Sequence, residues 1–185
     1  MDTSTEHVSC LTVPILADDK DWTWVLERPC PECRLDSANI PREQIAALVR
    51  AVGPLWCDAL RPADVRTRPE DSTWSVLEYA CHIRDVCRLF EERLVLMLTQ
   101  DDPVFANWDQ DETARTMAYA EQEPGTVATT LTDAAEKVAD RFAGVYGGQW
   151  RRPGRRSNGS AFTVESLGRY LLHDLVHHGH DSGAA

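Results

Sequence analysis

The sequence predicts an all-α fold, a four-helix bundle preceded by an irregular N-terminal extension. Four long stretches repeat apolar residues every three or four positions, which is the period of a helix that buries one face. Signals that start and stop helices bound these stretches, and none of them alternates apolar and polar residues as a half-buried strand does. The chain of 185 residues is long enough for one domain with a sizeable core.

Residues 1–38 are the predicted extension, and residues 39–185 form the predicted bundle domain. Trp22 and Trp24 favour packing of the extension on the bundle over exposure to solvent. The first residues are polar and lack the basic start and apolar stretch of a signal peptide, and no apolar run reaches the roughly 20 residues that span a bilayer. We therefore expect a cytoplasmic protein without a membrane partner, whose cysteines are mostly reduced.

The first helix is expected to begin at Pro41, because proline is favoured at the first helical position, and to end at Pro62. The second helix should begin after Ser75, since Ser75 and Glu78 have the spacing of a capping box. Its main apolar stripe comprises Val76, Ala80, Ile83, Cys87, Phe90, Leu94 and Met97. A second, narrower stripe comprises Glu78, His82, Asp85, Leu89 and Leu96. Two such stripes predict that this helix is central in the bundle.

Residues 101–123 are acidic, and a short helix is expected near residues 109–121. The third long helix should begin at Pro124, again at a favoured first position. The pair Gly147-Gly148 is expected to stop it, because glycine is unfavourable inside a helix.

Residues 149–162 have the composition of a polar loop. The fourth helix should begin after Thr163 as N-cap and run to about Gly179. It contains His173 and His177, which are four residues apart and therefore share one face of the helix, about one turn from each other.

A histidine pair of this spacing is typical of zinc sites in metalloproteases, but the glutamate of that motif is absent, so protease chemistry is not implied. A third ligand must come from another helix, and His82 is the only histidine elsewhere in a predicted helix. Three imidazoles with an open position form a catalytic zinc arrangement, which also accepts nickel or iron. The alternative is a solvated helix end, where cationic side chains interact favourably with the helix dipole.

The segment WSVLEYACHI at residues 74–83, together with Phe162-Thr163-Val164 and the histidine pair, resembles the DinB superfamily. That family includes YfiT-like proteins and the metal-binding domain of mycothiol-dependent maleylpyruvate isomerase. The resemblance covers roughly residues 40–180 and implies an up-down-down-up four-helix bundle, often a homodimer. It also implies metal ligands at His82, His173 and His177. The isomerase branch has Glu where this chain has His173, which favours the three-histidine branch.

The sequence also suggests roles for other residues near the predicted site. Glu78 and Asp85 lie one turn to either side of His82, and each could orient an imidazole or accept a proton, or be a charge on the helix surface. Tyr170 and Arg169 precede His173 by three and four residues, so one of them could line the mouth of a pocket. Asp174 is expected to be a surface residue or an indirect partner of the metal. His178 and His180 are expected to belong to the solvated helix end.

The net charge of −11 makes nucleic acid an unexpected partner, because a binding protein needs a basic face. One basic cluster, residues 151–156, runs against this charge. Its Arg152 and Arg155, with Arg169, could hold an anionic substrate or thiol, and the alternative is a solvated loop.

Cys30 and Cys33 form a single C-x-x-C, without the second pair that a structural zinc site needs in sequence. Cys10 or one of His178 and His180 could complete such a site only through tertiary contact. A turn with two unremarkable thiols is the alternative, as is a redox pair, for which the thioredoxin-like context is missing.

These observations lead to competing functions. The first is a metal-dependent thiol S-transferase, in which a low-molecular-weight thiol such as mycothiol or bacillithiol adds to a small electrophile. This reaction class comes from the family resemblance, and its chemistry is the lowering of a thiol pKa by the metal. Metal-assisted hydrolysis is the alternative reaction. A non-catalytic module that binds a metal or small ligand is the alternative of another class.

Overall fold

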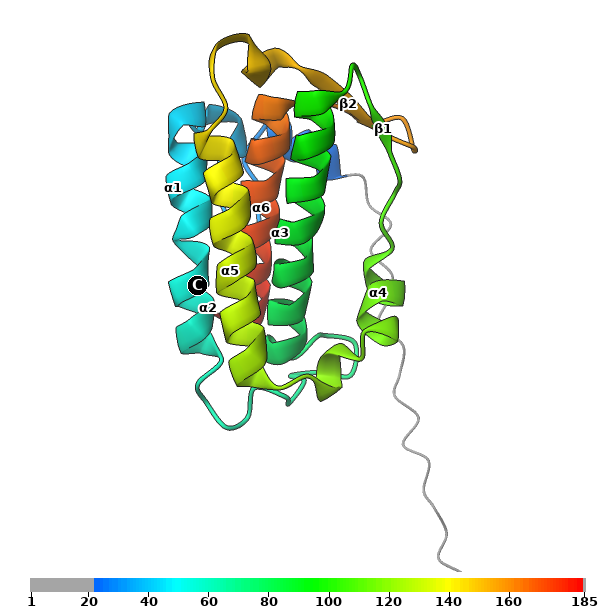
Figure 1. The fold of residues 1–185 in the computed structure, drawn as a ribbon. Helices are drawn as coiled ribbons and strands as arrows, with labels where there is room; N and C mark the ends of the chain where they lie inside the picture. The colour runs from blue at the N-terminus through cyan, green and yellow to red at the C-terminus, as the bar shows by residue number, and fades with distance from the viewer. Residues whose placement is uncertain (1–21, 185) are drawn as a thin grey trace, which may run out of the picture.

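The computed structural model describes residues 22–184 and confirms the predicted four-helix bundle (Figure 1). The first helix of the bundle is divided into α1 and α2, and the other three helices are α3, α5 and α6. Their bounds are Ile45–Arg50 for α1, Val52–Ala59 for α2, Val76–Thr99 for α3, Pro124–Ala143 for α5 and Val164–Ser182 for α6. Buried apolar side chains from all of them form one hydrophobic core.

The helices follow one another in up-down-down-up order, which the colours of Figure 1 let the reader trace. α3 and α5 run in the same direction and pack side by side, and the pair α1–α2 and α6 run in the opposite direction. Because α3 and α5 are parallel, the chain between them must return along the whole bundle. It does so beside α3, through β1 (Val104–Phe105), the helix α4 (Gln110–Thr116) and the 3-10 turn η4 (Tyr119–Glu121). α4 confirms the short helix predicted there.

The first helix differs from its prediction in two respects. It begins with a 3-10 turn, η3 (Arg42–Gln44), and Pro41 precedes that turn as its N-cap. It is also interrupted between Arg50 and Val52. The cause is Pro54, which has no N–H to donate to the carbonyl of Arg50 and whose ring crowds that carbonyl.

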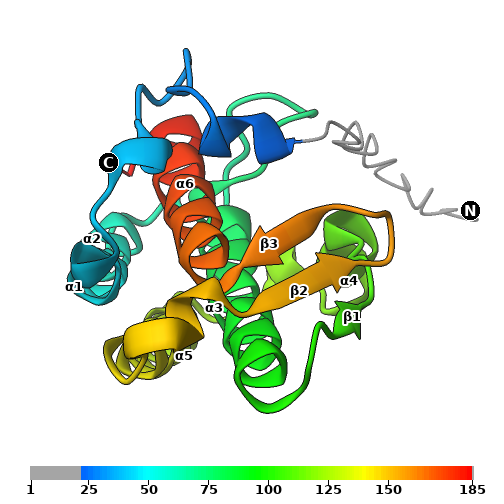
Figure 2. The same ribbon diagram turned by 90° about the horizontal axis from the view of Figure 1, so that it is seen from above.

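A small three-stranded sheet lies at the end of the bundle where α3 stops and α6 begins (Figures 1 and 2). β1 pairs in parallel with β2 (Pro153–Arg156), and β2 pairs antiparallel with β3 (Ala161–Thr163). The prediction of a polar loop over residues 149–162 was therefore wrong, since this segment also includes most of the 3-10 turn η5 (Gly147–Arg151). These strands are too short for a period-2 pattern to be seen in the sequence.

The ends of the last two long helices also differ from the predictions. α5 stops at Ala143 with Gly144 as C-cap, before the glycine pair that was expected to stop it. α6 begins after Thr163 as N-cap, as predicted, but continues to Ser182. Gly183, with φ of 70°, then takes the left-handed conformation that suits a residue just after a helix. None of the described helices combines the length and apolar character needed to cross a bilayer.

The described part of the N-terminal extension packs on α6. It forms the 3-10 turns η1 (Trp22–Leu26) and η2 (Ser37–Asn39), and both contact α6. The buried Ser37 hydroxyl donates a hydrogen bond to the Val25 carbonyl at 2.6 Å, which ties these turns together. Arg169 of α6 donates to the Ile40 carbonyl at 3.0 Å. This segment is therefore held in place by the same helix that bears the histidine pair.

Gly168 allows α6 to approach the first helix and α5 closely. A Cβ atom at this position would lie 2.9 Å from Phe142 and 3.0 Å from Ile45, both of which are buried. Gly168→Ala should therefore destabilise the fold by about 1–3 kcal/mol through overpacking. Alanine is otherwise the better helix former by about 1 kcal/mol. Urea denaturation measures the difference.

The matched control is Gly125→Ala in the first turn of α5, where a Cβ atom would meet nothing within 4 Å. This variant should be as stable as the wild type or slightly more stable. Equal stabilities of the Gly168→Ala and Gly125→Ala variants would contradict the role assigned to this contact.

Candidate metal centre

The predicted ligands His82, His173 and His177 do not gather in one place. His173 and His177 face the N-terminal segment, where Trp22 packs over both rings at centroid distances of 5.6 and 4.8 Å. His82 of α3 instead meets the next stripe of α6, which carries Asp174 and His178. Each step along a helix rotates the side chain by about 100°, so neighbouring residues belong to different faces. The expectations that His178 belongs to the solvated helix end, and that Asp174 is a surface residue or an indirect partner of the metal, are corrected accordingly.

Asp174 and His178 form an interior ligand cluster with His82. One nitrogen or oxygen from each of the three residues lies within 4.8 Å of the others. Asp174 Oδ1 is 3.1 Å from His178 Nε2 and 3.6 Å from His82 Nε2, and the His82 and His178 rings meet edge to face at 4.5 Å. This cluster has the composition of a divalent metal site, two imidazoles and one carboxylate.

The surroundings of His82 fit a bound cation. The side chain is buried, and the rings of Trp74 and Trp108 pack against it with centroid distances of 5.2 and 5.3 Å. Among the described residues, neither ring nitrogen of His82 has a hydrogen-bond partner, and buried Nδ1 of His178 has none either. Burial of polar atoms without partners costs free energy, and a metal ion would satisfy one nitrogen of each ring.

The protonation of this cluster follows from its burial and its charges. Burial, together with the neighbouring His178, lowers the pKa of His82 and keeps it in the neutral form that binds metals. Burial also opposes the charged forms of Asp174 and His178, but the contact between them, together with those of Asp174 with His82 and of His178 with Asp181, outweighs the effect of burial on both pKa values. The pKa of Asp174 is held well below its usual range, and that of His178 is raised to about 9. Without a metal, the cation beside Asp174 is thus the protonated His178.

An open cavity of about 490 Å³ adjoins the cluster. Asp174 and His178 line it from α6, and Trp108 lines it from the returning segment. Phe90, Arg93, Tyr170 and Arg156 form further parts of its wall. A ligand in the cavity can therefore reach the donor atoms of Asp174 and His178. Tyr170 also lines the cavity, and a pocket-lining position was expected for either Tyr170 or Arg169.

Two arginines of this wall, Arg93 and Arg156, have nitrogens without partners. Arg93 is 5% exposed, and its Nε has no hydrogen-bond partner in residues 22–184, as is also true of Nε and Nη2 of Arg156. Burial and the nearby Arg156 lower the pKa of Arg93 to about 10. The Arg156 guanidinium lies 5.1 Å from the ring centroids of Phe162 and Tyr170, which fix its orientation. Two such cations are suited to a carboxylate or phosphate.

The predicted anion-binding arginines have other partners. Arg152 donates to the carbonyls of Met97 and Gln100 at the end of α3, at 2.5 and 2.6 Å. Arg155 points away from the bundle to Asp102, because successive side chains of a strand face opposite sides. Arg169 binds the Ile40 carbonyl and Glu165. None of the three lines the cavity, and Arg156 of the same basic cluster does.

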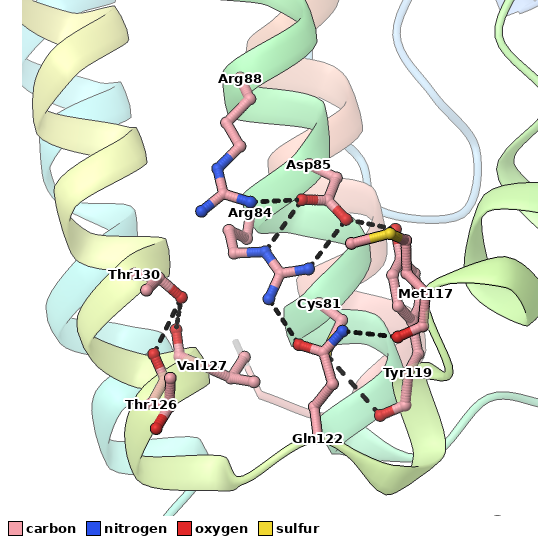
Figure 3. A network of polar contacts seen from close by, with 10 residues as sticks. All are labelled: Cys81, Arg84, Asp85, Arg88, Met117, Tyr119, Gln122, Thr126, Val127 and Thr130. Atoms are coloured by element: carbon pink, nitrogen blue, oxygen red, sulfur yellow. Dashed lines mark hydrogen bonds and ion pairs between the residues drawn. The ribbon is translucent and has the colours of Figure 1, made fainter.

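The two carboxylates predicted near His82 also have structural partners. Asp85 binds Arg84 and Arg88 and accepts a hydrogen bond of 2.7 Å from Tyr119, so it ties α3 to η4 (Figure 3). Glu78 accepts hydrogen bonds from the Ser75 backbone and from Arg68, each at 2.9 Å. Neither carboxylate lines the cavity, so neither is in place to accept a proton from a ligand there.

His173 and His177, on the neighbouring stripe of α6, lie beside Cys30 and Cys33 of the C-x-x-C. One donor atom each from Cys30, Cys33, His173 and His177 lies within 4.8 Å of the others. Burial and the neighbouring imidazoles hold the pKa of both histidines below the usual value, at about 4 for His173. Of the partners considered from sequence, His178 belongs to the other cluster and His180 is exposed, and Cys10 lies outside the described residues.

The fold and these clusters define a helical-bundle protein with a candidate metal centre. Comparison with protein families matches the DinB superfamily over residues 17–181, so this chain belongs to that superfamily. No curated protein matches the chain. One solved structure is described as "YfiT from Bacillus subtilis is a probable metal-dependent hydrolase with an unusual four-helix bundle topology". It matches with a TM-score of 0.68 at 17% identity, over 77% of this chain and 85% of that one, which establishes likeness of fold.

Glu78 is a stabilising residue, and its replacement gives a pH-dependent effect. Burial raises its pKa, but the Arg68 and Ser75 hydrogen bonds outweigh burial and lower it from 4.5. Glu78→Gln should therefore destabilise the protein by about 1–3 kcal/mol at neutral pH. The wild-type advantage is fully present above pH 4.5 and is lost as the pH falls through the lower folded pKa.

Urea denaturation at pH 7 and at pH 3–4 measures both effects. Glu92→Gln, at an exposed position of the same helix, is the control and should change the free energy of unfolding little at either pH. A Glu78→Gln variant as stable as the control at neutral pH would contradict the assignment.

Proposed function

We propose that this chain is a metal-dependent enzyme that acts on a small anionic substrate, with its metal held by His82, Asp174 and His178. The proposal is carried by the buried imidazole nitrogens that make no hydrogen bond within the described part of the chain, and which lie beside a carboxylate at the wall of an open cavity. Two imidazoles and a carboxylate suit zinc, nickel or iron, and three protein ligands leave their coordination incomplete. When bound, such an ion supplies Lewis acidity and lowers the pKa of a thiol or water.

The remaining residues of the cavity bind the substrate and shield the site. Arg93 and Arg156 line the cavity, and a guanidinium at the cavity wall suits a carboxylate or phosphate. Tyr170 stacks on Phe90 at 6.0 Å and supports the Arg156 guanidinium from one side. Trp108 packs on His82 and excludes water from that ring.

Within this proposal, the favoured reaction is transfer of a low-molecular-weight thiol, such as mycothiol or bacillithiol, to an anionic electrophile. It is supported by the resemblance to the metal-binding domain of mycothiol-dependent maleylpyruvate isomerase and by the two arginines at the cavity. Metal-assisted hydrolysis is the second candidate, supported by the fold shared with a structure described as a probable metal-dependent hydrolase. Products that contain the thiol distinguish transfer from hydrolysis by mass.

Loss of a ligand should remove both metal and turnover. His82→Ala and Asp174→Ala should each lose one equivalent of metal. Each should also lower the rate on the order of 100-fold or more, since replacing even an indirect partner of a metal lowers metal affinity or activity by about 10–100-fold. Elemental analysis after loading with zinc, nickel or iron measures the first effect. A panel of thiols and unsaturated carboxylates, assayed with and without thiol, measures the second.

His180→Ala is the control, because His180 is exposed near the end of the same helix. It should keep the metal and the activity of the wild type. Wild-type metal content in both ligand variants would overturn the assigned ligands, and bound metal without turnover of any substrate would favour the non-catalytic module.

Arg156→Met should weaken the binding of anionic substrates. Loss of charged hydrogen bonds worth about 1.5–3 kcal/mol raises KM roughly 10- to 150-fold, with a smaller effect on kcat. The control is Arg155→Met, whose side chain faces Asp102 outside the cavity. Steady-state kinetics with a carboxylate and its neutral ester measures the effect. An equal rise in KM for the ester, or for the control variant, would show that Arg156 does not bind the anion.

A further inference from the structure

Four metal-binding side chains lie together outside the centre described above. Cys30 and Cys33 come from the N-terminal segment, and His173 and His177 come from α6. Their donor atoms all lie within 4.8 Å of one another, although more than 130 positions of sequence separate the two pairs. Two thiols and two imidazoles are a ligand set of structural zinc sites, which are closed by four protein ligands.

The local backbone explains how each pair is formed. Cys30 and Cys33 flank a tight turn, in which the Arg34 N–H donates to the Cys30 carbonyl at 2.9 Å and the Cys30 N–H donates to the Leu35 carbonyl at 3.0 Å. Arg34 closes the turn with φ of 63°, in the left-handed region. On α6 the four-residue spacing stacks the imidazoles of His173 and His177 with centroids 5.0 Å apart.

The distances and orientations fit coordination by one ion. Zinc bonds of about 2.3 Å to sulfur and 2.0–2.1 Å to nitrogen place tetrahedral donors about 3.3–3.8 Å apart. Cys30 Sγ is 3.7 Å from Nδ1 of His177. The other nitrogen of that ring, Nε2, lies 3.4 Å from Glu32 and 3.5 Å from Asp181, the carboxylate partners that commonly orient a metal-bound histidine. Nε2 of His173 is buried and has no hydrogen-bond partner among residues 22–184.

We propose that Cys30, Cys33, His173 and His177 bind one structural zinc ion, which fixes the N-terminal segment to α6. The inference goes beyond the proposed function and is independent of it, because the two sites share no ligand. A redox pair of the two cysteines leaves the convergence of both imidazoles on the sulfurs unexplained. The carboxylates of Glu32 and Asp181 meet His177 on its far side and complete its orientation.

The consequence for the cavity runs through Trp22. This residue lines the cavity, and its ring packs over His177 at 4.8 Å and over His173 at 5.6 Å. A zinc ion that fixes both imidazoles and the turn of Cys30 also fixes the surface on which Trp22 rests. The structural zinc therefore shapes one wall of the cavity beside the other metal centre.

Cobalt substitution of the full-length chain tests this inference. Cobalt bound through thiolates gives a thiolate-to-metal charge-transfer band in the near ultraviolet, and the interior cluster, as far as the structure describes the chain, contains no cysteine to produce one. The wild type should show this band together with strong tetrahedral ligand-field bands, and added zinc should remove both. Cys33→Ser removes one of the two sulfurs. If cobalt no longer binds, the charge-transfer band should disappear, and if cobalt still binds through Cys30, the band should shift and lose roughly half its intensity. His82→Ala should keep the full band.

Zinc content provides the matching stoichiometry. The loaded wild type should hold two ions, and Cys33→Ser and His82→Ala should each lose a different one. Cys57→Ser is the control, because Cys57 lies in α2 beside Thr132, away from both clusters. It should keep the cobalt spectrum and both ions.

Absence of the charge-transfer band from the cobalt-loaded wild type would overturn the inference, whether or not the Cys33→Ser variant folds. So would an unchanged spectrum in Cys33→Ser. If the band is absent while one His82-dependent ion remains, the proposed function survives without the structural zinc. If the band is present and no His82-dependent ion binds, the structural zinc survives and the proposed function fails.

Discussion

The rotation of α6 about its own axis is the constraint on which both ligand clusters depend. Two neighbouring stripes of this helix each carry two ligand side chains at four-residue spacing, and only one stripe can face α3. The rotation is set by packing, since Gly168 lies in close contact with Phe142 and Ile45, and apolar side chains such as Leu171 and Leu175 are buried. With α6 fixed in this way, Asp174 points toward His82, and the adjoining stripe points toward the N-terminal segment.

The two clusters are therefore neighbours along α6, and Asp181 contacts both of them. Asp181 lies 3.5 Å from Nε2 of His177 in one cluster and 3.6 Å from Nδ1 of His178 in the other. The cavity is lined by residues from both stripes, so its shape depends on the N-terminal segment as well as on the bundle. The two clusters lie close together but differ in the chemistry of their side chains. The interior one contains a carboxylate and faces arginines, whereas the other holds thiols beside imidazoles of lowered pKa.

The predicted starts of α3 and α6, after Ser75 and Thr163, were confirmed, whereas the prediction of anion-binding arginines, which depended on partners distant in sequence, was not. Capping boxes at Ser75 and Thr163 involve residues three positions apart, so the sequence contains the whole interaction. The arginines were misassigned because their partners are distant, as with Arg152 at the end of α3. One signal was present: Arg93 continues the narrow stripe of α3 between Leu89 and Leu96, so its spacing places it on the same face of the helix as His82. The strands left no such signal, because strands of two to four residues show no period.

By itself, the sequence determined the four amphipathic helices, their caps and the residue types that could bind a metal. Spacing of three or four residues fixes which side chains share a face of a helix, and it does so whatever the helix packs against. The tertiary structure alone decided which face meets which neighbour. It joined His82 with Asp174 and His178, and it brought the C-x-x-C to His173 and His177. The reason is that helix rotation and the path of the N-terminal segment are set by the packing of the whole core, to which each residue contributes only a little.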